Sequence, residues 1–401
     1  MSADHNPPNR RAEVDHLIAD DKFDRASTAL RELWRRETSS ATAAFVATRL
    51  DQLREKLPLT KFKLAFLRSF TVEPIIPLLR AEAFAYGIDL EIHVGDFNTY
   101  VQDIVDPQSS LYRFAPNAAI LAVRAEDVAP DLTINFADQS PEAAQQAAAR
   151  VARSYEQWVN SFRQHSHAAL IIHALECRTP ASLGVLDNQT ESGQSGLIRQ
   201  INRELRRIAS AQHGVYILDY DALVARHGSE HWHDERKWQM ARLPISADHL
   251  LHMAREWMRF LVPLTGRTAK CLVVDLDNTL WGGIIGEDGM IGIKVSAEYP
   301  GAAFQSLHRA ELRPSEHVLA PQIKVCARAL GSRSLRASGT HDHQYADRPQ
   351  HRFPTEPTGP WSIAACDAVR PRARPPCTVI RSAAPTRCAV RAMPLHDSRP
   401  R

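Results

Sequence analysis

Two carboxylates follow a short apolar run in the C-terminal half of the chain. The run 271–274 is apolar and β-branched, as is typical of a buried strand, and Asp275, Asp277 and Thr279 follow it at alternate positions. In an open parallel α/β sheet, chemistry gathers beyond the carboxyl ends of the strands. Two carboxylates held together there repel each other unless a cation neutralises them, and hard oxygen ligands suit Mg²⁺. The pattern therefore predicts a Mg²⁺ site at Asp275 and Asp277, where one carboxylate attacks phosphorus and the other moves a proton.

The spacing Asp-x-Asp-x-Thr resembles the first motif of the haloacid dehalogenase (HAD) superfamily, although a turn with Asx hydrogen bonds gives the same spacing. The continuation through residue 289, Asn-Thr-Leu-Trp-Gly-Gly-Ile-Ile-Gly-Glu-Asp-Gly, is more specific. It resembles the FkbH-like branch, HAD subfamily IIIC. The resemblance implies catalytic and metal-binding roles for Asp275 and Asp277. It also implies that the substrate is bound by Asn278, Thr279, Gly282 and Gly283.

Strands alternate with helices ahead of this motif, which predicts a doubly wound parallel sheet. Two further helices are expected within residues 11–57. A polar loop at 184–196 is long enough to cover a site. The expected strands are 62–67, 90–94, 118–123, 168–173 and 215–218. The expected helices are 74–86, 141–162, 196–211 and 246–260, the last with Ser246 as N-cap.

A second chemistry is possible in this α/β region. Ser69 and Thr71 come directly after the first strand, where an SGNH-type hydrolase carries its nucleophilic serine, and the FkbH-like family has an SGNH-like domain ahead of its HAD domain. Such a serine needs a base and an orienting acid, for which Asp248, His249 and His252 are candidates. Their spacing departs from Asp-x-x-His, and Leu-Arg-Ser-Phe-Thr replaces the Gly-Asp-Ser signature. The alternative is that Ser69 or Thr71 caps a helix and the histidines lie on a helix surface.

Other polar residues of this region carry weaker signals. His231 and His233 are possible metal ligands, but two histidines without a further ligand are weak evidence. Asp219 and Asp221 follow the strand at 215–218. These residues resemble the linking region of the family more than a catalytic site.

Composition limits the class of protein. The chain has 401 residues, 44% hydrophobic and 24% charged, as in an ordinary soluble protein of two or three domains. No apolar run approaches the ~20 residues of a membrane helix, and the N-terminus lacks the layout of a signal peptide. We expect a cytoplasmic protein without a membrane partner. The six cysteines show neither a Cys-x-x-Cys pair nor zinc spacing.

The last ninety residues differ from the rest. Residues 310–401 hold 14 Arg and 1 Lys against 7 acidic residues, with 12 Pro and four of the six cysteines. We interpret this composition as out-of-frame translation of a GC-rich gene, with the frame changing near 309–313, so we expect no nucleic-acid partner. A disordered basic tail is the alternative. The Ser or Thr, the Lys and the acidic pair that complete a HAD site are not recognisable after Arg309.

The sequence thus predicts an α/β chain with an SGNH/flavodoxin-like sheet, the first part of a Rossmann-like HAD domain and a disordered tail. The expected boundaries are 1–60 (helical), 61–262 (SGNH-like), 268–309 (HAD-like) and 310–401 (tail). The resemblance implies Mg²⁺-dependent phosphoryl chemistry, coupled to loading of a glyceryl-type acyl unit from a small phosphorylated metabolite onto an acyl carrier protein in polyketide-type biosynthesis. We expect this chain to be impaired. A phosphatase of small phosphomonoesters, a non-catalytic truncated product and a binding module made of the SGNH-like domain are the alternatives.

Overall fold

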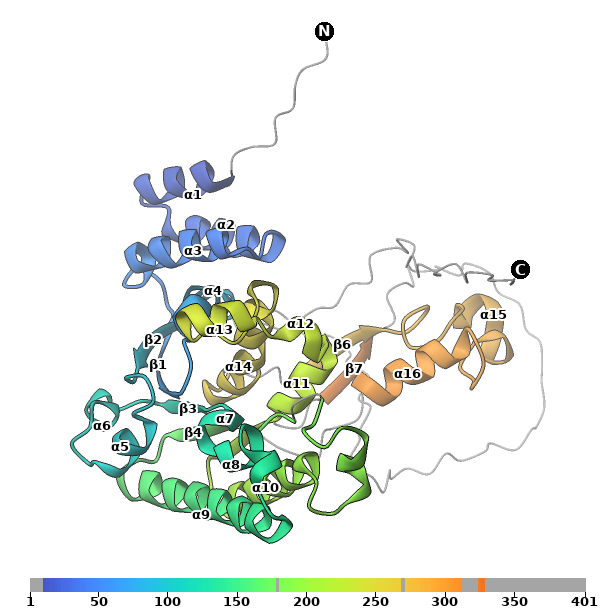
Figure 1. The fold of residues 1–401 in the computed structure, drawn as a ribbon. Helices are drawn as coiled ribbons and strands as arrows, with labels where there is room; N and C mark the ends of the chain where they lie inside the picture. Colours follow the sequence, from blue (N-terminus) through green and yellow to red (C-terminus); the bar gives the residue numbers. More distant parts are fainter. Residues whose placement is uncertain (1–9, 178–179, 268–270, 312–323, 329–401) are drawn as a thin grey trace, which may run out of the picture. The chain divides into compact units, whose positions relative to one another are not determined.

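The computed structural model describes residues 10–177, 180–267, 271–311 and 324–328 (Figure 1). The chain divides into two compact units, one ending at Gly266 and the other beginning at Arg267. Each unit is described below by itself. The domain boundaries expected from the sequence stay predictions.

The first unit is built on a five-stranded parallel sheet. Its strands are β1 (Thr60–Arg68), β2 (Ile88–Val94), β3 (Ala118–Ala122), β4 (Ala169–His173) and β5 (Val215–Leu218). The strand order β2-β1-β3-β4-β5 is that of flavodoxin-like folds. The register pairs Leu64 of β1 with Ala118 of β3, and Ile171 of β4 with Tyr216 of β5. The predicted doubly wound parallel sheet is confirmed.

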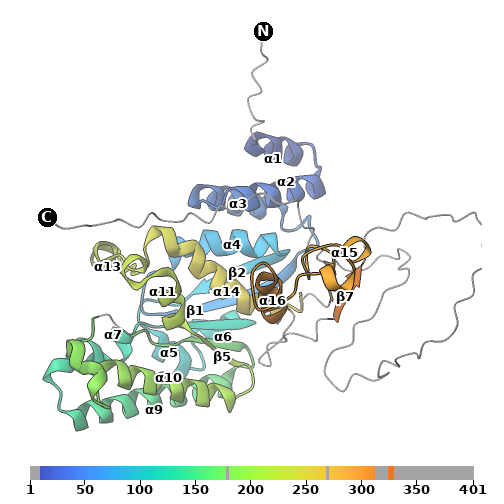
Figure 2. The same ribbon diagram turned by 90° about the vertical axis from the view of Figure 1, so that its right-hand side faces the viewer.

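Alternate residues of each strand enter two different apolar cores. In β1, Leu64 and Phe66 face a core shared with α4 and α14, whereas Ala65 and Leu67 face a core shared with α9 and α10. Figures 1 and 2 show these helix pairs on opposite sides of the sheet. Both faces are therefore covered, which explains why the central strands β3 and β4 are buried at every position, whereas the edge strand β2 alternates apolar and polar residues.

The helices of this unit mostly follow the predicted pattern. Ser140 caps the long helix α9 by accepting a hydrogen bond from the amide of Ala143. The helices at the sheet are α4 (Ile76–Ala85), α5 (Tyr100–Val105), α6 (Ser110–Phe114), α7 (Ala125–Val128), α8 (Pro130–Thr133), α9 (Pro141–His165), α10 (Gln194–Ser210), α11 (Tyr220–His227), α12 (Ser229–Trp232), α13 (Glu235–Ala241) and α14 (Leu250–Leu264). Short 3₁₀ turns lie at Glu73–Ile75, Phe136–Asp138, Gly184–Gln189 and Ala247–His249.

The N-terminal segment forms three helices, so the prediction of two was wrong. They are α1 (Arg10–Ala19), α2 (Phe23–Arg36) and α3 (Ser40–Leu53). The chain turns at Asp21, which has a left-handed φ of 55°. The apolar residues Leu17, Ile18 and Phe23 on the two sides of this turn form only a rough stripe, and it was interpreted as one helix across the break.

The second unit contains the Asp-x-Asp-x-Thr motif. Strand β6 (Cys271–Asp275) pairs in parallel with β7 (Lys324–Arg328), and Asp275 lies opposite Arg328. Helices α15 (Ile285–Gly292) and α16 (Gly301–Glu311) lie between these strands in the sequence. Of the predicted tail at 310–401, the structure describes the end of α16 and β7, and the rest lies outside the described residues. No helix in the described ranges is long and apolar enough to cross a membrane.

Candidate functional site

Ser69 directly follows β1, at the carboxyl edge of the sheet. Its side chain is fully buried, and its Oγ accepts a hydrogen bond of 3.0 Å from the amide of Arg124. The hydroxyl also bonds to the carboxyl group of Asp127. Both contacts come from the segment after β3, so Ser69 joins the ends of two neighbouring strands.

Neither hydroxyl after β1 caps a helix, so the helix-cap alternative was wrong. Thr71 Oγ1 donates to the carbonyl of Ala241 at 2.6 Å, and the turn at 73–75 begins without a side-chain cap. The nucleophilic role of Ser69 stays a prediction. Its geometry favours a structural role because both the donor and the acceptor of the hydroxyl are engaged.

We expect a serine-directed fluorophosphonate to leave Ser69 unlabelled in the folded chain. Ser69→Ala should lower the free energy of unfolding by about 1–3 kcal/mol, since it strips the amide of Arg124 of its partner. Denaturant unfolding of Ser69→Ala and of Thr71→Ala, whose site water can reach, measures the difference. Labelling that disappears in Ser69→Ala would instead establish the nucleophile.

A narrow cavity of about 10 Å³ lies at the same edge of the sheet. It holds about one water molecule and no substrate. Ser69 is not part of its lining. The residues that line it are Phe70, Val123, Arg124, Ala125, His173, Ala174, Glu176, Tyr220, His233 and Pro244.

An ion pair between Glu176 and His233 borders this cavity. His233 Nε2 lies 3.1 Å from the Glu176 carboxylate, and Nδ1 lies 3.2 Å from the carbonyl of Ser229. Burial lowers the pKa of His233, but the hydrogen bond and charge of Glu176 outweigh it, so that the pKa is raised. The stabilisation by this pair is complete below the unfolded-state pKa of His233 and is lost as the pH rises through its folded-state pKa.

Arg124 covers the neighbouring part of the edge. Its guanidinium lies 3.8 Å from the centre of the Trp238 ring and pairs with Glu126 at 3.0 Å. Stacking on an indole and pairing with a carboxylate hold the Arg side chain in a fixed direction. The edge therefore has an ordered set of ionisable groups beside a very small cavity.

His173 and Tyr220 of this lining both have pKa values that burial shifts strongly, downward for the imidazole and upward for the phenol. His173 is fully buried, it stacks on Tyr220, and its Nε2 accepts a 2.9 Å hydrogen bond from the indole of Trp257. Burial lowers the pKa of His173 to about 3. The imidazole is therefore neutral at pH 7 and carries its proton on Nδ1.

The structure does not bring the predicted base to the cavity lining. His249 Nδ1 bonds to Ser246 Oγ at 2.8 Å, and its ring lies 5.6 Å from that of His227. Ser246 is the N-cap residue of the turn at 247–249, as predicted, but its hydroxyl makes no capping hydrogen bond. His252 stacks on His227, and Asp248 is exposed. These side chains line or adjoin a separate pocket.

The other polar residues have structural contacts. Asp219 caps α11 by accepting from the amide of Ala222, and Asp221 accepts from the amide of Cys177. His231 is exposed, whereas both ring nitrogens of His233 have partners. Within the described ranges, no group of three or more His, Cys, Asp or Glu side chains is arranged to hold a metal.

The loop after β6 is organised around Asp277. Its Oδ1 accepts hydrogen bonds from the indole of Trp281 at 3.1 Å and from the amide of Ile285 at 3.2 Å. Asn278 has a left-handed φ of 55°, and its Oδ1 accepts from the amide of Gly283 at 2.9 Å. The side chains at the start of the loop thus accept hydrogen bonds from groups near its end, which explains why polar residues are needed at 277 and 278.

The glycines of this loop are required by close packing and backbone conformation. A Cβ on Gly282 would lie 2.9 Å from the ring of Phe304, and Gly283 has a φ of 101°. Thr279 is half-buried, and its amide donates to the carbonyl of Leu276. The predicted substrate-binding roles of Asn278, Thr279, Gly282 and Gly283 stay predictions.

The donor set of this loop fits Mg²⁺ in kind. The described hydrogen bonds of Asp277 all go to Oδ1, which leaves Oδ2 as a hard oxygen donor. The side chain of Asp275 is outside the described part of the chain. A Mg²⁺ ion usually binds one or two carboxylates and keeps several waters, so Asp277 and Asp275 are of the right kind to hold it, but the pair alone is expected to bind it weakly without the later acidic pair.

Comparison with known proteins gives a family and a fold. Residues 63–261 match the family model described as FkbH, N-terminal domain. The N-terminal part of protein BF1531 from Bacteroides fragilis, containing a phosphatase domain complexed with Mg, is 20% identical with a TM-score of 0.55, and the match covers 68% of this chain and 70% of that chain. None of the curated proteins matches the chain.

Two further solved structures are similar over half of this chain. The lipase Lip_vut3 from a goat rumen metagenome is 12% identical with a TM-score of 0.38, over 50% of this chain and 96% of that chain. The acetyl xylan esterase AlAXEase is 14% identical with a TM-score of 0.34, over 50% of this chain and 99% of that chain.

Proposed function

The chain belongs to the FkbH family, whose N-terminal domain it carries at residues 63–261, and we propose that it derives from an enzyme of Mg²⁺-dependent phosphoryl chemistry. In this proposal the second unit carries out the chemistry at Asp275 and Asp277. This phosphoryl chemistry is coupled to the loading of a glyceryl-type acyl unit from a small phosphorylated metabolite onto an acyl carrier protein. In the loading step the carrier thiolate attacks the acyl carbon, the thioester forms and the group that activated that carbon leaves, whereas Asp275 removes a phosphate ester elsewhere on the unit.

Each carboxylate has its own role in the proposed reaction. Asp275 attacks phosphorus, the bond from phosphorus to the leaving oxygen breaks, and Asp277 gives that oxygen a proton. Water then attacks the aspartyl-phosphate, Asp277 takes its proton, and inorganic phosphate leaves. When bound, Mg²⁺ neutralises the charge of the two carboxylates and of the phosphoryl group.

The observation that carries the proposal is the arrangement around Asp277. Two N–H groups hold Oδ1, from Trp281 and Ile285, so Oδ2 keeps a fixed direction for a proton or a cation. Positioning of this kind supplies most of the rate in phosphoryl transfer. The protein BF1531, with a phosphatase domain complexed with Mg, supports the same chemistry for this chain.

We expect the activity of this chain to be weak. The hydroxyl, the lysine and the later acidic pair of the family are not recognisable after Arg309. Without them the phosphoryl group loses part of its charge stabilisation. Turnover should stay below the ~1 s⁻¹ of an ordinary enzyme.

A binding role for the first unit is a second candidate. The cavity beside Glu176 and His233 measures about 10 Å³, which is too small for an acyl substrate. This argues against acyl chemistry in that cavity and leaves the binding of a partner as the alternative role of the unit. A simple phosphatase of small phosphomonoesters differs from both because it needs no carrier protein.

A transfer assay separates these functions. The purified chain is incubated with Mg²⁺, a phosphorylated three-carbon acyl donor and an acyl carrier protein bearing its free thiol, and the carrier is weighed by intact-protein mass spectrometry. Slow gain of one glyceryl group, lost in Asp275→Asn, is the expected result. Phosphate release without carrier loading would establish the phosphatase, and carrier binding without either reaction would establish the binding module.

A further inference from the structure

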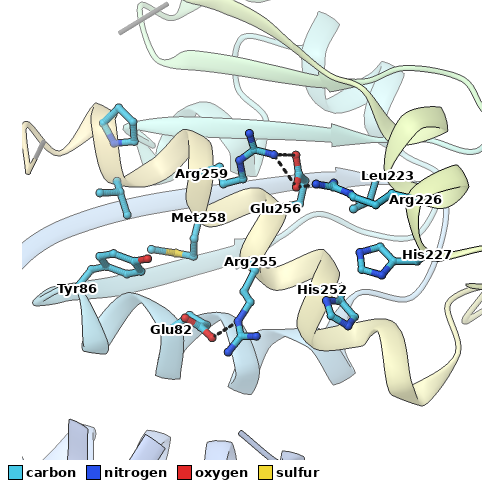
Figure 3. Close-up of a pocket in the computed structure, with 12 residues that line it drawn as sticks. Glu82, Tyr86, Leu223, Arg226, His227, His252, Arg255, Glu256, Met258 and Arg259 are labelled. Carbon is cyan, nitrogen blue, oxygen red and sulfur yellow. Dashed lines mark hydrogen bonds and ion pairs between the residues drawn. The ribbon is translucent and has the colours of Figure 1, made fainter. Parts of the chain in front are cut away.

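The first unit has a much larger pocket, separate from the carboxyl edge of the sheet. Its volume is about 630 Å³, within the range of small-molecule sites. Helix α14 forms the floor, and α4 and α11 supply the walls (Figure 3). The lining residues are Glu82, Tyr86, Leu223, Arg226, His227, His252, Arg255, Glu256, Met258, Arg259, Val262 and Pro263.

Three arginines in this pocket keep unused donors. Arg226 Nη2 and Arg259 Nη1 both bond to Glu256, at 3.2 and 2.9 Å, and Arg255 Nε bonds to Glu82 at 2.8 Å. Each guanidinium is thus engaged through one nitrogen, and the three side chains are 53%, 67% and 48% exposed. Three guanidinium groups face two carboxylates, so the pocket has an excess of positive charge.

Two histidines lie beside these arginines. The rings of His227 and His252 are 4.1 Å apart, and the ring of His249 lies within 6 Å of both. Burial, with help from the neighbouring histidines and arginines, lowers the pKa of His227 and of His252. An anion bound in the pocket would act in the opposite direction and raise the pKa of both histidines.

The opposite part of the pocket is apolar. Figure 3 shows Tyr86 and Met258 on the side away from His227 and His252. Tyr86 is half exposed, whereas Met258 is buried beneath the opening. A ligand that fits has an anionic group at one end and an apolar body at the other.

We propose that this pocket binds an organic phosphate monoester, with the phosphate at Arg226 and Arg259, whose guanidinium groups meet at Glu256, and the organic group against Tyr86 and Met258 (Figure 3). A planar guanidinium group can donate two parallel hydrogen bonds to two phosphate oxygens, whereas a lysine ammonium acts as a point charge. The two negative charges of a phosphate dianion neutralise two positive charges, the one in excess from the arginines and the one on a protonated histidine. The site is distinct from the Asp277 loop, and its occupancy is independent of the proposed reaction.

Ligand binding should draw a proton onto the histidine pair. The charged groups around His227 and His252 are Arg226 of α11, Arg255 and Glu256 of α14, Glu82 of α4, and His249 of the turn before α14. The two glutamates are already paired with arginines, so the phosphate becomes the strongest new source of negative charge. We expect proton uptake at pH 7 when the phosphate binds.

Isothermal titration calorimetry of the full chain with phenyl phosphate tests the proposal. Phenyl phosphate should bind at least about tenfold more tightly than inorganic phosphate, because its ring is buried, and more tightly than benzoate, a monoanion. Titrations in two buffers of different ionisation heat should show proton uptake that His252→Gln removes. Equal affinity for phenyl phosphate and inorganic phosphate, or for phenyl phosphate and benzoate, would overturn the proposal.

Arg259→Gln is the sharpest variant. Glu256 keeps Arg226 as a partner after this change, whereas Arg255→Gln would leave the buried Glu82 unpaired. Arg259→Gln should weaken phenyl phosphate binding by about tenfold. Arg150→Gln on α9 is the matched control, since Arg150 is also exposed and paired with a carboxylate, and it should leave the affinity within about twofold. An unchanged affinity in a folded Arg259→Gln chain would overturn the site.

Discussion

Asp277→Asn should remove most of whatever Mg²⁺-dependent phosphatase turnover the purified chain shows. Proton transfer by a positioned side chain contributes about 10²–10⁴-fold, and an amide can neither give nor take the proton. The amide also weakens the Mg²⁺ site because its oxygen carries no charge. Release of inorganic phosphate from a generic phosphomonoester, with and without Mg²⁺, measures the loss. Asp275→Asn should abolish the turnover, because it removes the nucleophile.

A charge-matched control lies in the helix that follows the Asp277 loop. Glu287 is exposed near the start of α15, and Glu287→Gln changes the local charge by the same amount as Asp277→Asn. Its turnover should stay within about twofold of the parent chain. Parent-like turnover in Asp275→Asn would contradict the aspartyl-phosphate mechanism. A parent rate at or above ~1 s⁻¹ would contradict the expected impairment instead.

The sheet of the first unit was predictable because its central strands are buried on both faces and its edge strand β2 alternates apolar and polar residues. The runs ending at Leu67 and His173 are apolar for several residues, and turn residues or charged residues bound them. Observed strand ends differ from the predicted ends by a few residues at most, since helices cover both faces. The break at Asp21 was not predictable, because the conformation of one residue decided it.

The candidate site was less predictable than the fold. Glu176 and His233 are 57 residues apart in the sequence, and only the sheet brings them together. A signal did exist, because Glu176 follows the end of β4 by three residues and His233 lies within Trp-His-Asp. The sequence instead favoured His249, since a histidine late in the domain fits the SGNH order. Chain order did not predict that His249 would lie with His227 and His252.

The FkbH resemblance was the most informative signal, and the family is confirmed. It rested chiefly on the motif after residue 270, with weaker support from Asp219, Asp221 and His233, whereas the family model matches 63–261. The two lines of argument therefore overlap only in that weaker part. Carrier loading and the acyl donor stay proposals.

His173→Gln should flatten the loss of stability that the chain suffers in acid. The folded-state pKa of His173 is lowered to about 3 by burial, whereas an unfolded histidine titrates near 6.5. Between these pH values the histidine is protonated in the unfolded state but not in the folded state. The free energy of unfolding therefore falls as the pH drops below about 6.5. His173 alone should make the free energy of unfolding fall by up to about 1.4 kcal/mol for each pH unit in this range. Denaturant unfolding followed by tryptophan fluorescence from pH 7.5 to pH 4.5 measures it.

The comparison between variants isolates His173 from the other groups that titrate in acid. His227 and His252 also have lowered pKa values, so they give the same sign, but they are present in both chains. A glutamine at 173 can still accept the hydrogen bond of Trp257 Nε1 through its amide oxygen, which keeps the core intact at pH 7. His213→Gln, at an exposed position, should retain the parent slope. If His173→Gln lost stability with pH as steeply as the parent, His173 would have to be protonated in the folded chain, and the neutral imidazole beneath the carboxyl edge would be refuted.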